Sequence, residues 1–116
     1  RHALEEAERN RRRWRIMVET LPKPAVHHED GALWPNEPLL HLLGHARTEL
    51  ATPDAWFARV HGAEAVATRA LIDEARRAGF PRSLTLAARR ADGAPCWLEL
   101  TAHLYEPGEV WLIEDI

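Results

Sequence analysis

Histidine is the residue type whose number and spacing first suggest chemistry, since seven of the 116 residues are His. His41 and His45 are four residues apart, the spacing of two metal ligands on one helical face. Gly44 is expected to end that helix before His45, so the pair does not share a face. His27 and His28 are adjacent in an expected strand and point to opposite sides of it. The spacing therefore predicts no metal or haem site. The histidines that remain to be checked are His61 and His103.

Carboxylate pairs are the other possible catalytic groups. Glu29-Asp30 and Glu114-Asp115 fall at an expected turn and at the last expected strand, where solvation accounts for adjacent acidic residues. The sequence contains no nucleophile elbow, glycine-rich phosphate loop or metal-binding motif. It also offers no cluster of polar side chains from which a catalytic cleft could be assembled. We therefore predict that the chain is not an enzyme.

An arginine run, residues 11–13 followed by Arg15, could contact phosphates. The run shares its expected helix with several glutamates, and this mixture is more typical of the solvated flank of a coiled coil. The formal net charge of −3 also argues against a general nucleic-acid-binding protein, which is usually basic. No nucleic-acid partner is expected.

The composition is that of one ordinary globular domain, with 46% hydrophobic and 28% charged residues. A chain of this length forms only a modest core. No apolar stretch is long enough to cross a bilayer, so we expect no direct membrane insertion. The single Cys96 excludes an internal disulfide and suits a reducing compartment, and we expect a cytoplasmic location.

The N-terminal 20 residues predict a helix resembling one strand of a coiled coil. They lack Gly and Pro, and Pro22 and Pro24 follow directly. Positions three and four apart form a heptad seam that Arg11 weakens. The seam consists of Leu4, Ala7, Arg11, Trp14, Val18 and Leu21.

The next segment predicts two short strands and a capped helix. Residues 25–29 and 32–34 are joined by Asp30-Gly31, a hairpin turn signal. Asn36 is an expected N-cap, and Gly44 closes the very apolar helix that follows. Thr52 is expected to cap a further short helix.

A longer helix is expected over residues 63–78, followed by three long antiparallel strands. Val66, Ala70, Leu71 and Ala75 share one face of this helix, and we expect that face to pack on the core. Alternating apolar residues after Pro81 predict the strands, with hairpins at residues 91–93 and 107–108. The sequence therefore predicts an α+β fold, a five-stranded antiparallel sheet with helices on one face and an additional amphipathic N-terminal helix.

In their order and spacing, several segments resemble a PAS domain, the sensory box of bacterial signalling proteins. They are Leu21-Pro22, Asp30-Gly31, Asn36 through Leu43-Gly44-His45, Trp56 with Val60-His61, Arg89-Arg90 with Asp92-Gly93 and Trp97, and Glu114-Asp115-Ile116. The resemblance covers residues 21–116, which leaves residues 1–20 as a linker helix. Two departures are His45, where an aromatic ring is common, and Gly62-Ala63, which replace a Pro and an acidic residue.

The resemblance implies a sensory or dimerisation module placed before an output domain. The chain begins at Arg1 and stops after an apolar strand, so we expect a module of a longer protein. The general appearance of residues 105–116 favours a diguanylate cyclase over a histidine kinase as the covalently linked output domain. Glu114, Asp115 and Ile116 are the expected signal exit.

The resemblance implies no recognisable cofactor. A flavin-binding PAS domain carries a reactive Cys beside a characteristic helix, whereas Cys96 lies in an expected strand, where a thiol is inert. A haem-binding PAS domain commonly carries a His on the long helix, and residues 63–78 contain none. An unknown small ligand remains open.

Large apolar residues give two sets of candidate site residues. The first fills the core or lines a ligand pocket between sheet and helices, and consists of Trp34, Leu43, Trp56, Phe57, Leu71, Leu98 and Leu100. The second joins the first helix to the outer sheet face or to a second subunit, and consists of Leu4, Trp14, Val18, Leu21, Trp97, Trp111 and Ile113.

Both faces of the last strand are apolar, because Val110 and Leu112 alternate with Trp111 and Ile113. Such a strand must be covered on both sides, by the first helix, by a second subunit or by both. We therefore expect a homodimeric sensory or signal-relay module in which a small ligand, or a partner, favours one arrangement of the sheet and its covering helix. The alternative is a ligand-free structural dimerisation or spacer domain with a filled core.

Overall fold

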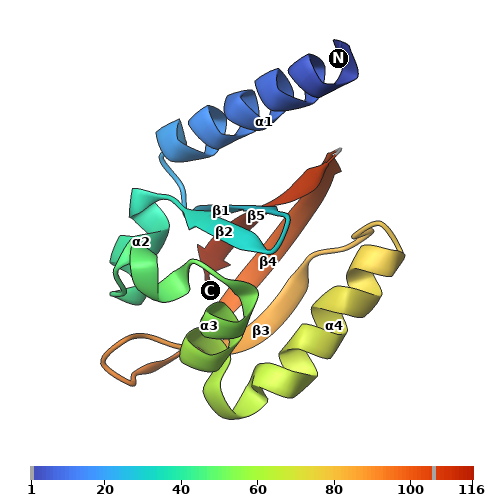
Figure 1. Ribbon diagram of the computed structural model, residues 1–116. Coiled ribbons are helices and arrows are strands. Elements are labelled where there is room, and N and C mark those ends of the chain that lie inside the picture. Colours follow the sequence, from blue (N-terminus) through green and yellow to red (C-terminus); the bar gives the residue numbers. More distant parts are fainter. Residues whose placement is uncertain (1, 106) are drawn as a thin grey trace.

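A computed structural model describes residues 2–105 and 107–116. Its centre is one five-stranded antiparallel sheet in the order β2-β1-β5-β4-β3 (Figure 1). The last strand in the sequence thus lies in the middle of the sheet. The strands are β1 (Ala25–Glu29), β2 (Ala32–Pro35), β3 (Leu84–Arg89), β4 (Pro95–Tyr105) and β5 (Gly108–Asp115).

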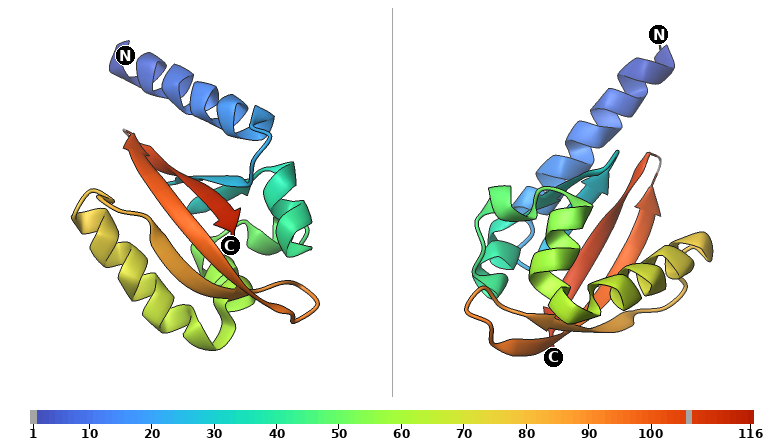
Figure 2. Two further views of the ribbon diagram at one scale, coloured as in Figure 1. Left: turned by 180° about the vertical axis from the view of Figure 1, so that it is seen from behind. Right: turned by 60° about the horizontal axis from the view of Figure 1, so that its bottom comes forward.

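Helices cover both faces of the sheet. The short helices and α4 cover one face, called here the inner face, and α1 crosses the other, the outer face (Figures 1 and 2). The N-terminal half of α1 projects beyond the body of the domain (Figure 2). The helices are α1 (His2–Thr20), α2 (Glu37–Leu43), α3 (Pro53–Trp56) and α4 (Ala65–Arg77), with single turns η1 (Arg47–Leu50), η2 (Phe57–His61) and η3 (Gly62–Glu64).

Local sequence signals account for most element boundaries. Asp30 and Gly31 both have positive φ, 53° and 75°, as the two-residue turn between β1 and β2 requires. The side chain of Asn36 accepts a hydrogen bond from the Leu39 amide at the start of α2. Gly44 ends α2 in the left-handed conformation, with φ 78°. The predicted α+β fold and the predicted caps are confirmed.

The buried face of α4 differs from the prediction. Val66 is 85% exposed and Leu71 is 49% exposed, whereas Thr68 and Ile72 are buried. Two overlapping sets of small and apolar residues on α4 recur with the helical period, so the sequence alone does not show which set is buried.

Strand β5 is apolar on both faces and covered on both, as predicted. Trp111 and Ile113 are each 1% exposed and belong to the inner core. Val110 is 2% exposed and packs with Leu112 in the smaller cluster beneath α1. The sheet is therefore the middle layer of three.

Candidate functional site

The interior between the sheet and the helices on its inner face is filled by aromatic and aliphatic side chains. Trp56 of α3 meets Trp111 of β5 edge to face, with ring centroids 5.6 Å apart. Both rings are 1% exposed, as are Leu98 and Leu100 of β4. Exposure this low leaves these side chains next to neither bulk water nor an internal void. A small ligand would have to displace some of them.

The predicted pocket residues separate into two groups. Leu43, Trp56, Phe57, Leu98 and Leu100 come together in the inner core. Leu71 points outward from α4, and Trp34 lies on the outer face of β2, so neither lines the interior. The placement predicted for Trp34 is wrong because its neighbour Leu33 takes the inward position in the alternation of β2.

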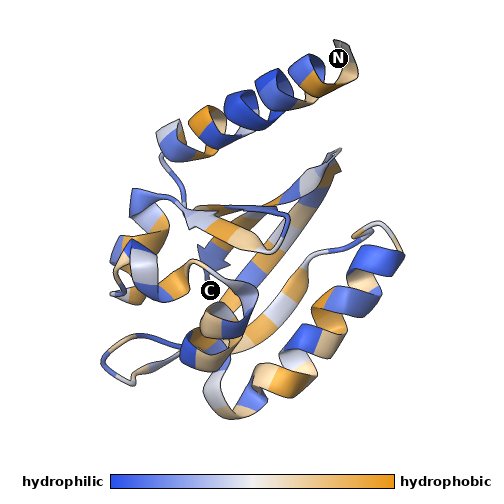
Figure 3. Cartoon of the chain, viewed as in Figure 1, coloured by the Kyte–Doolittle hydropathy of each residue, from blue (hydrophilic) through white to orange (hydrophobic). Residues whose placement is uncertain are grey.

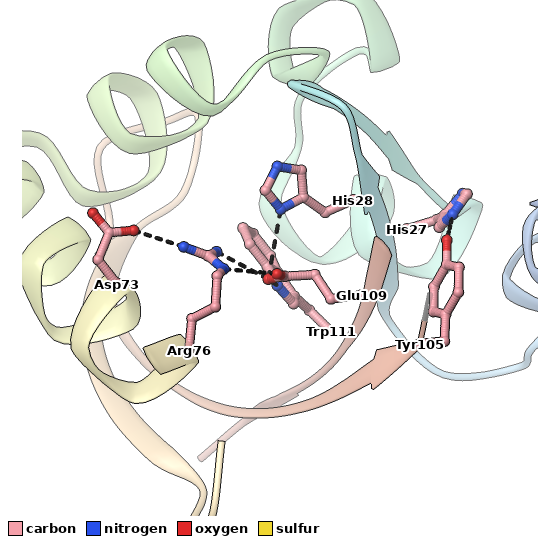
Figure 4. A network of polar contacts seen from close by, with 7 residues as sticks. All are labelled: His27, His28, Asp73, Arg76, Tyr105, Glu109 and Trp111. Carbon is pink, nitrogen blue, oxygen red and sulfur yellow. Dashed lines mark hydrogen bonds and ion pairs between the residues drawn. The ribbon is translucent and has the colours of Figure 1, made fainter. Parts of the chain in front are cut away.

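A polar cluster lies on the inner face around Glu109, which is 5% exposed (Figure 4). Arg76 of α4 donates to both Glu109 oxygens, at 2.7 and 2.9 Å. Trp111 Nε1 donates to the same carboxylate at 2.6 Å. Asp73 accepts from Arg76 at 2.7 Å, and His28 Nδ1 lies 3.5 Å from Glu109. These five residues, the inner polar cluster, connect α4 to strands β1 and β5.

The electrostatics of this cluster keep Glu109 ionised. Burial alone would raise the pKa of Glu109, but the polar contacts from His28, Arg76 and Trp111 and the charge on Arg76 outweigh it and lower the pKa to about 2. The pKa of Arg76 is raised, mainly by its hydrogen bonds to Glu109. The cluster is therefore a charged pair within a mostly apolar layer.

His61 is a second buried polar group on the inner face. Its Nε2 accepts from Trp56 Nε1 at 3.2 Å, so Nδ1 carries the proton and donates to the Ala87 carbonyl at 2.9 Å. Burial lowers the pKa of His61. The neutral ring thus joins η2 and α3 to β3.

The outer face carries an aromatic assembly beneath α1, called here the outer stack. Trp14 of α1 stacks on Tyr105 of β4, and Tyr105 stacks on His27 of β1. His27 in turn stacks on Trp34 of β2, with ring centroids 5.1 Å apart. The guanidinium of Arg15, which also belongs to α1, lies 4.4 Å from the centre of the Trp34 ring. Both ends of the outer stack therefore contact α1.

Polar contacts reinforce the outer stack. His27 Nε2 and the Tyr105 hydroxyl form a hydrogen bond (Figure 4), and Arg11 of α1 pairs with Glu29 of β1. His27 is fully buried, and burial, followed by the charge of Arg15, lowers its pKa to about 4. Arg11, which interrupts the predicted heptad seam, thus serves as a partner for a buried carboxylate.

The predicted helix-sheet contact residues are only partly brought together. Trp14 and Val18 of α1 and Leu21, which follows it, pack against the sheet, but Leu4 is 73% exposed and Trp97 is 56% exposed. Trp111 and Ile113 face the inner core instead. Because both faces of β5 are apolar, alternation alone could not tell which set meets α1, and it is Val110 and Leu112.

The C-terminal end of β5 is connected to the helices of the inner face. Arg90, in the β3–β4 loop, donates to Asp115 at 2.7 Å and to the Leu42 carbonyl of α2 at 2.6 Å. The Ile116 amide donates to the Trp97 carbonyl at 3.0 Å. Glu114 points to the exposed outer face. Arg90 belongs to the basic segment noted in the sequence, but its two contacts could not be found from sequence alone.

Two polar pairs were missed by sequence reasoning: Arg76 with Glu109, and His27 with Tyr105. Arg76 and Glu109 are 33 residues apart in the sequence, and His27 and Tyr105 are 78 apart, so no local signal connects the members of either pair. Within residues 2–105 and 107–116, no three His, Cys, Asp or Glu side chains gather as metal ligands would. None of the helices in this part of the chain has the length and hydropathy of a membrane span.

The strand order and the placement of the short helices are those of the PAS/LOV domain fold, and solved structures of that fold superpose on this chain. No family model and no curated protein matches the sequence. The LOV protein of Rhodobacter sphaeroides superposes with a TM-score of 0.71 at 18% identity, covering 88% of this chain and 64% of that one.

Two further neighbours are domains of larger signalling proteins. One is the N-terminal domain of a diguanylate cyclase with a PAS/PAC sensor from Marinobacter aquaeolei, with TM-score 0.68, 14% identity, and coverage of 79% of this chain and 93% of that one. The other is the PAS domain of a LuxR-family transcriptional regulator from Burkholderia thailandensis in complex with ethanol, with TM-score 0.65, 18% identity, and coverage of 89% and 96%. At these identities the likeness shows the fold alone.

Proposed function

We propose that this domain is a non-catalytic, homodimeric signal-relay module that regulates a covalently linked output domain. The fold supports this proposal, because its structural neighbours include sensor domains of a diguanylate cyclase and of a blue-light activated histidine kinase. As the output domain we favour a diguanylate cyclase over a histidine kinase, in line with the residue pattern of positions 105–116.

The observation that carries the proposal is the position of β5. Its inner face packs on the helical layer through Trp111 and Ile113, and its outer face packs under α1 through Val110. Its end is tied to α2 through Asp115 and Arg90. A shift of either covering layer therefore changes the environment of one strand, and that strand leads directly to the exit residues 114–116. This is the arrangement that a population shift between two packings requires.

The filled interior favours relay without a small ligand. Trp56, Trp111, Leu98 and Leu100 leave no space beside them, so binding would need a rearrangement of the core. The second candidate function is a small-ligand sensor, and the ethanol bound by the LuxR-family PAS domain is the observation that favours it.

Native mass spectrometry of the purified protein tests assembly and ligand together. We expect a dimer with no retained small molecule. A monomer at micromolar concentration would contradict the dimer, and a stoichiometric bound molecule would replace relay by ligand sensing.

The relay itself is tested in the full-length protein with Asp115→Asn and Arg90→Gln. Arg90→Gln removes the guanidinium that links β5 to α2, and Asp115→Asn removes the charge that holds Arg90 on β5. We expect the output domain to lose its response to changes in this domain while the domain remains folded. Asp92→Asn, in the same loop and not bonded to β5, is the matched control. If the output domain responds as in the wild type in both variants, the relay proposal is wrong.

A further inference from the structure

The outer stack contains the only tyrosine in the sequence, Tyr105. Its side chain is half-buried, and its hydroxyl forms a hydrogen bond with Nε2 of the fully buried His27 (Figure 4). A phenol gives up an electron readily only if its proton leaves at the same time, because the phenol radical cation is a very strong acid. A base within hydrogen-bond reach of the hydroxyl is therefore the feature that makes a tyrosine a one-electron redox site.

His27 meets the requirements for that base. Burial, followed by the charge of Arg15, lowers its pKa to about 4, so the ring is neutral at pH 7 and keeps one nitrogen free to accept a proton. Within the part of the chain that the structure describes, no other group accepts a hydrogen bond from the Tyr105 hydroxyl. We therefore assign the hydroxyl as the donor to Nε2 and place the ring proton of His27 on Nδ1.

The charged groups around His27 set the cost of giving its ring a second proton. Arg11, Arg15 and His28 oppose the new positive charge. Glu29 favours it, since its Oε1 is buried, lies 3.8 Å from Nε2, and has no hydrogen-bond partner among the described residues. The protonated ring thus meets a buried carboxylate oxygen that the neutral ring leaves unused.

Trp14 connects this pair to the solvent. It belongs to α1, is half-buried, and stacks on Tyr105 with ring centroids 4.7 Å apart. Figure 3 shows hydrophilic colouring over most of α1, as expected for a helix whose outward side is in water. Trp56 and Trp111, in contrast, are each 1% exposed in the inner core, where a dissolved oxidant does not reach them. Electrons pass quickly between stacked rings and slowly over longer distances, so Trp14 is the ring through which such an oxidant takes an electron from Tyr105.

We propose that Tyr105, with His27 as its proton acceptor and Trp14 as its electron relay, is a one-electron redox site of this domain. The oxidant is a dissolved one-electron acceptor, either a small radical or an oxidised metal complex. It gains one electron, the O–H bond of Tyr105 breaks, and an N–H bond forms at Nε2 of His27, which leaves a neutral tyrosyl radical beside an imidazolium. A one-electron reductant such as ascorbate reverses the step, and the proton returns to the phenol oxygen. This activity is separate from the proposed relay and does not depend on dimerisation.

Photochemical oxidation of the purified domain tests the proposal. A ruthenium tris-bipyridine complex, excited by a laser flash and quenched by a cobalt(III) ammine, supplies the oxidant, and transient absorption with EPR distinguishes tyrosyl from tryptophan radicals. Because the chain has a single tyrosine, any tyrosyl signal belongs to Tyr105. We expect this signal to form more slowly in D₂O. Its rate should be constant between about pH 5 and pH 8, where His27 is neutral.

Two substitutions of His27 separate the base from the ring. His27→Phe keeps a stacked ring, His27→Gln keeps a hydrogen-bond acceptor, and neither has a basic nitrogen. We expect each to lower the tyrosyl yield by about tenfold or more, with tryptophan radicals in its place. His103→Phe, which changes an exposed histidine on the same strand as Tyr105, is the matched control and should keep the wild-type yield. Trp14→Phe keeps a stacked ring that is harder to oxidise, so the tyrosyl signal should form more slowly.

Far-UV circular dichroism should show each variant folded, and if one His27 variant does not fold the other replaces it. If neither folds, the pH profile and the D₂O effect of the wild type decide. Tryptophan radicals alone in the wild type would overturn the proposal. A rate that rises steadily with pH, or a tyrosyl yield unchanged in both His27 variants, would also overturn it, because the proton then goes to water. An unchanged rate in Trp14→Phe would overturn the electron path.

Discussion

Trp14 of α1 stacks almost parallel on Tyr105 of β4, with ring centroids 4.7 Å apart and an interplanar angle of 14°. The N-terminal helix is therefore joined to the sheet by an aromatic contact near its C-terminal end. Only the C-terminal half of the predicted heptad seam packs on the sheet, through Trp14 and Val18, since Leu4 near the start of the helix is exposed.

Trp14→Ala should release α1 from the sheet. The change removes the stack on Tyr105 and leaves a gap next to Val18, which we expect to lower the free energy of unfolding by about 1–3 kcal/mol. Hydrogen exchange should show lost protection in residues 10–20, with β4 and β5 less affected. Leu4→Ala is the matched control on the same helix and should change neither measurement. Retained protection of α1 in the Trp14 variant would contradict the role of the stack.

Acidification should destabilise the domain through His27. Its pKa is lowered to about 4 in the folded chain from an ordinary 6.5, so between these values the unfolded chain binds a proton that the folded chain does not. The free energy of unfolding should therefore decrease as pH falls from about 6.5 to about 4, by up to about 3 kcal/mol. The charged groups around the ring, Arg11, Arg15 and His28, act in the same direction, and Glu29 opposes them.

Urea unfolding at pH 7 and at pH 4.5 measures this effect. His27→Phe keeps a ring between Trp34 and Tyr105 but cannot titrate, so its stability should depend less on pH than that of the wild type. His103→Gln, an exposed histidine of β4, is the control and should keep the wild-type slope. Equal slopes for the wild type and the Phe variant would show that His27 is not the titrating group.

Glu109→Gln should destabilise the domain by about 2–4 kcal/mol at pH 7, because it removes the carboxylate that accepts two hydrogen bonds from the half-buried Arg76 and leaves only Asp73 to balance the Arg76 charge. In the wild type the contribution of Glu109 is present above pH 4.5 and should disappear as pH falls towards 2, since the pKa is lowered to about 2. Thermal unfolding at fixed protein concentration measures the change. Glu74→Gln, exposed on α4, should stay within about 0.5 kcal/mol of the wild type.

Gly62→Ala should destabilise the turn into α4. Gly62 has φ 54° and ψ −118°, a backbone conformation that residues with a Cβ rarely adopt. A Cβ there would also lie 2.6 Å from Arg89 Cζ. We expect a loss of about 1–3 kcal/mol in chemical unfolding. If the backbone is the cause, adding Arg89→Ala will not rescue the variant, whereas full rescue would assign the cost to the side-chain contact.

Asn36 is fully buried and satisfies four hydrogen-bonding groups at once. Its carbonyl oxygen accepts from the amides of Ala25 and Leu39, and its amide nitrogen donates to the carbonyls of Val18 and Lys23. Asn36→Asp keeps the helix cap but loses both donated bonds and places a carboxylate against two carbonyls. We expect a loss of about 2–4 kcal/mol in chemical unfolding, well above the cost of a lost cap alone. A near-wild-type Asp variant would show that only the cap matters.

The order of elements could be predicted because its signals are local. Asp30-Gly31, Asn36 and Gly44 each specify a turn, cap or stop within a few residues, and alternation marks β4 and β5. From that order of helices and strands we could predict the antiparallel sheet and the helices that cover it. The candidate site residues could be located only in part, since Trp56, Leu98 and Leu100 lie in the inner core, one of the two places expected for them, whereas Trp34, Leu71 and Trp111 lie elsewhere than expected.

By itself, then, the sequence determined which segments become strands and helices, and that β5 must be covered on both sides. Only the tertiary structure decided which side of β5 meets α1, how α4 is rotated, and that Arg76 pairs with Glu109 and His27 with Tyr105. The physical reason is that a strand apolar on both faces, or a helix with two overlapping stripes, has no preferred orientation of its own. That orientation, like the partners of buried polar groups, is set by register and packing against segments far away in the chain.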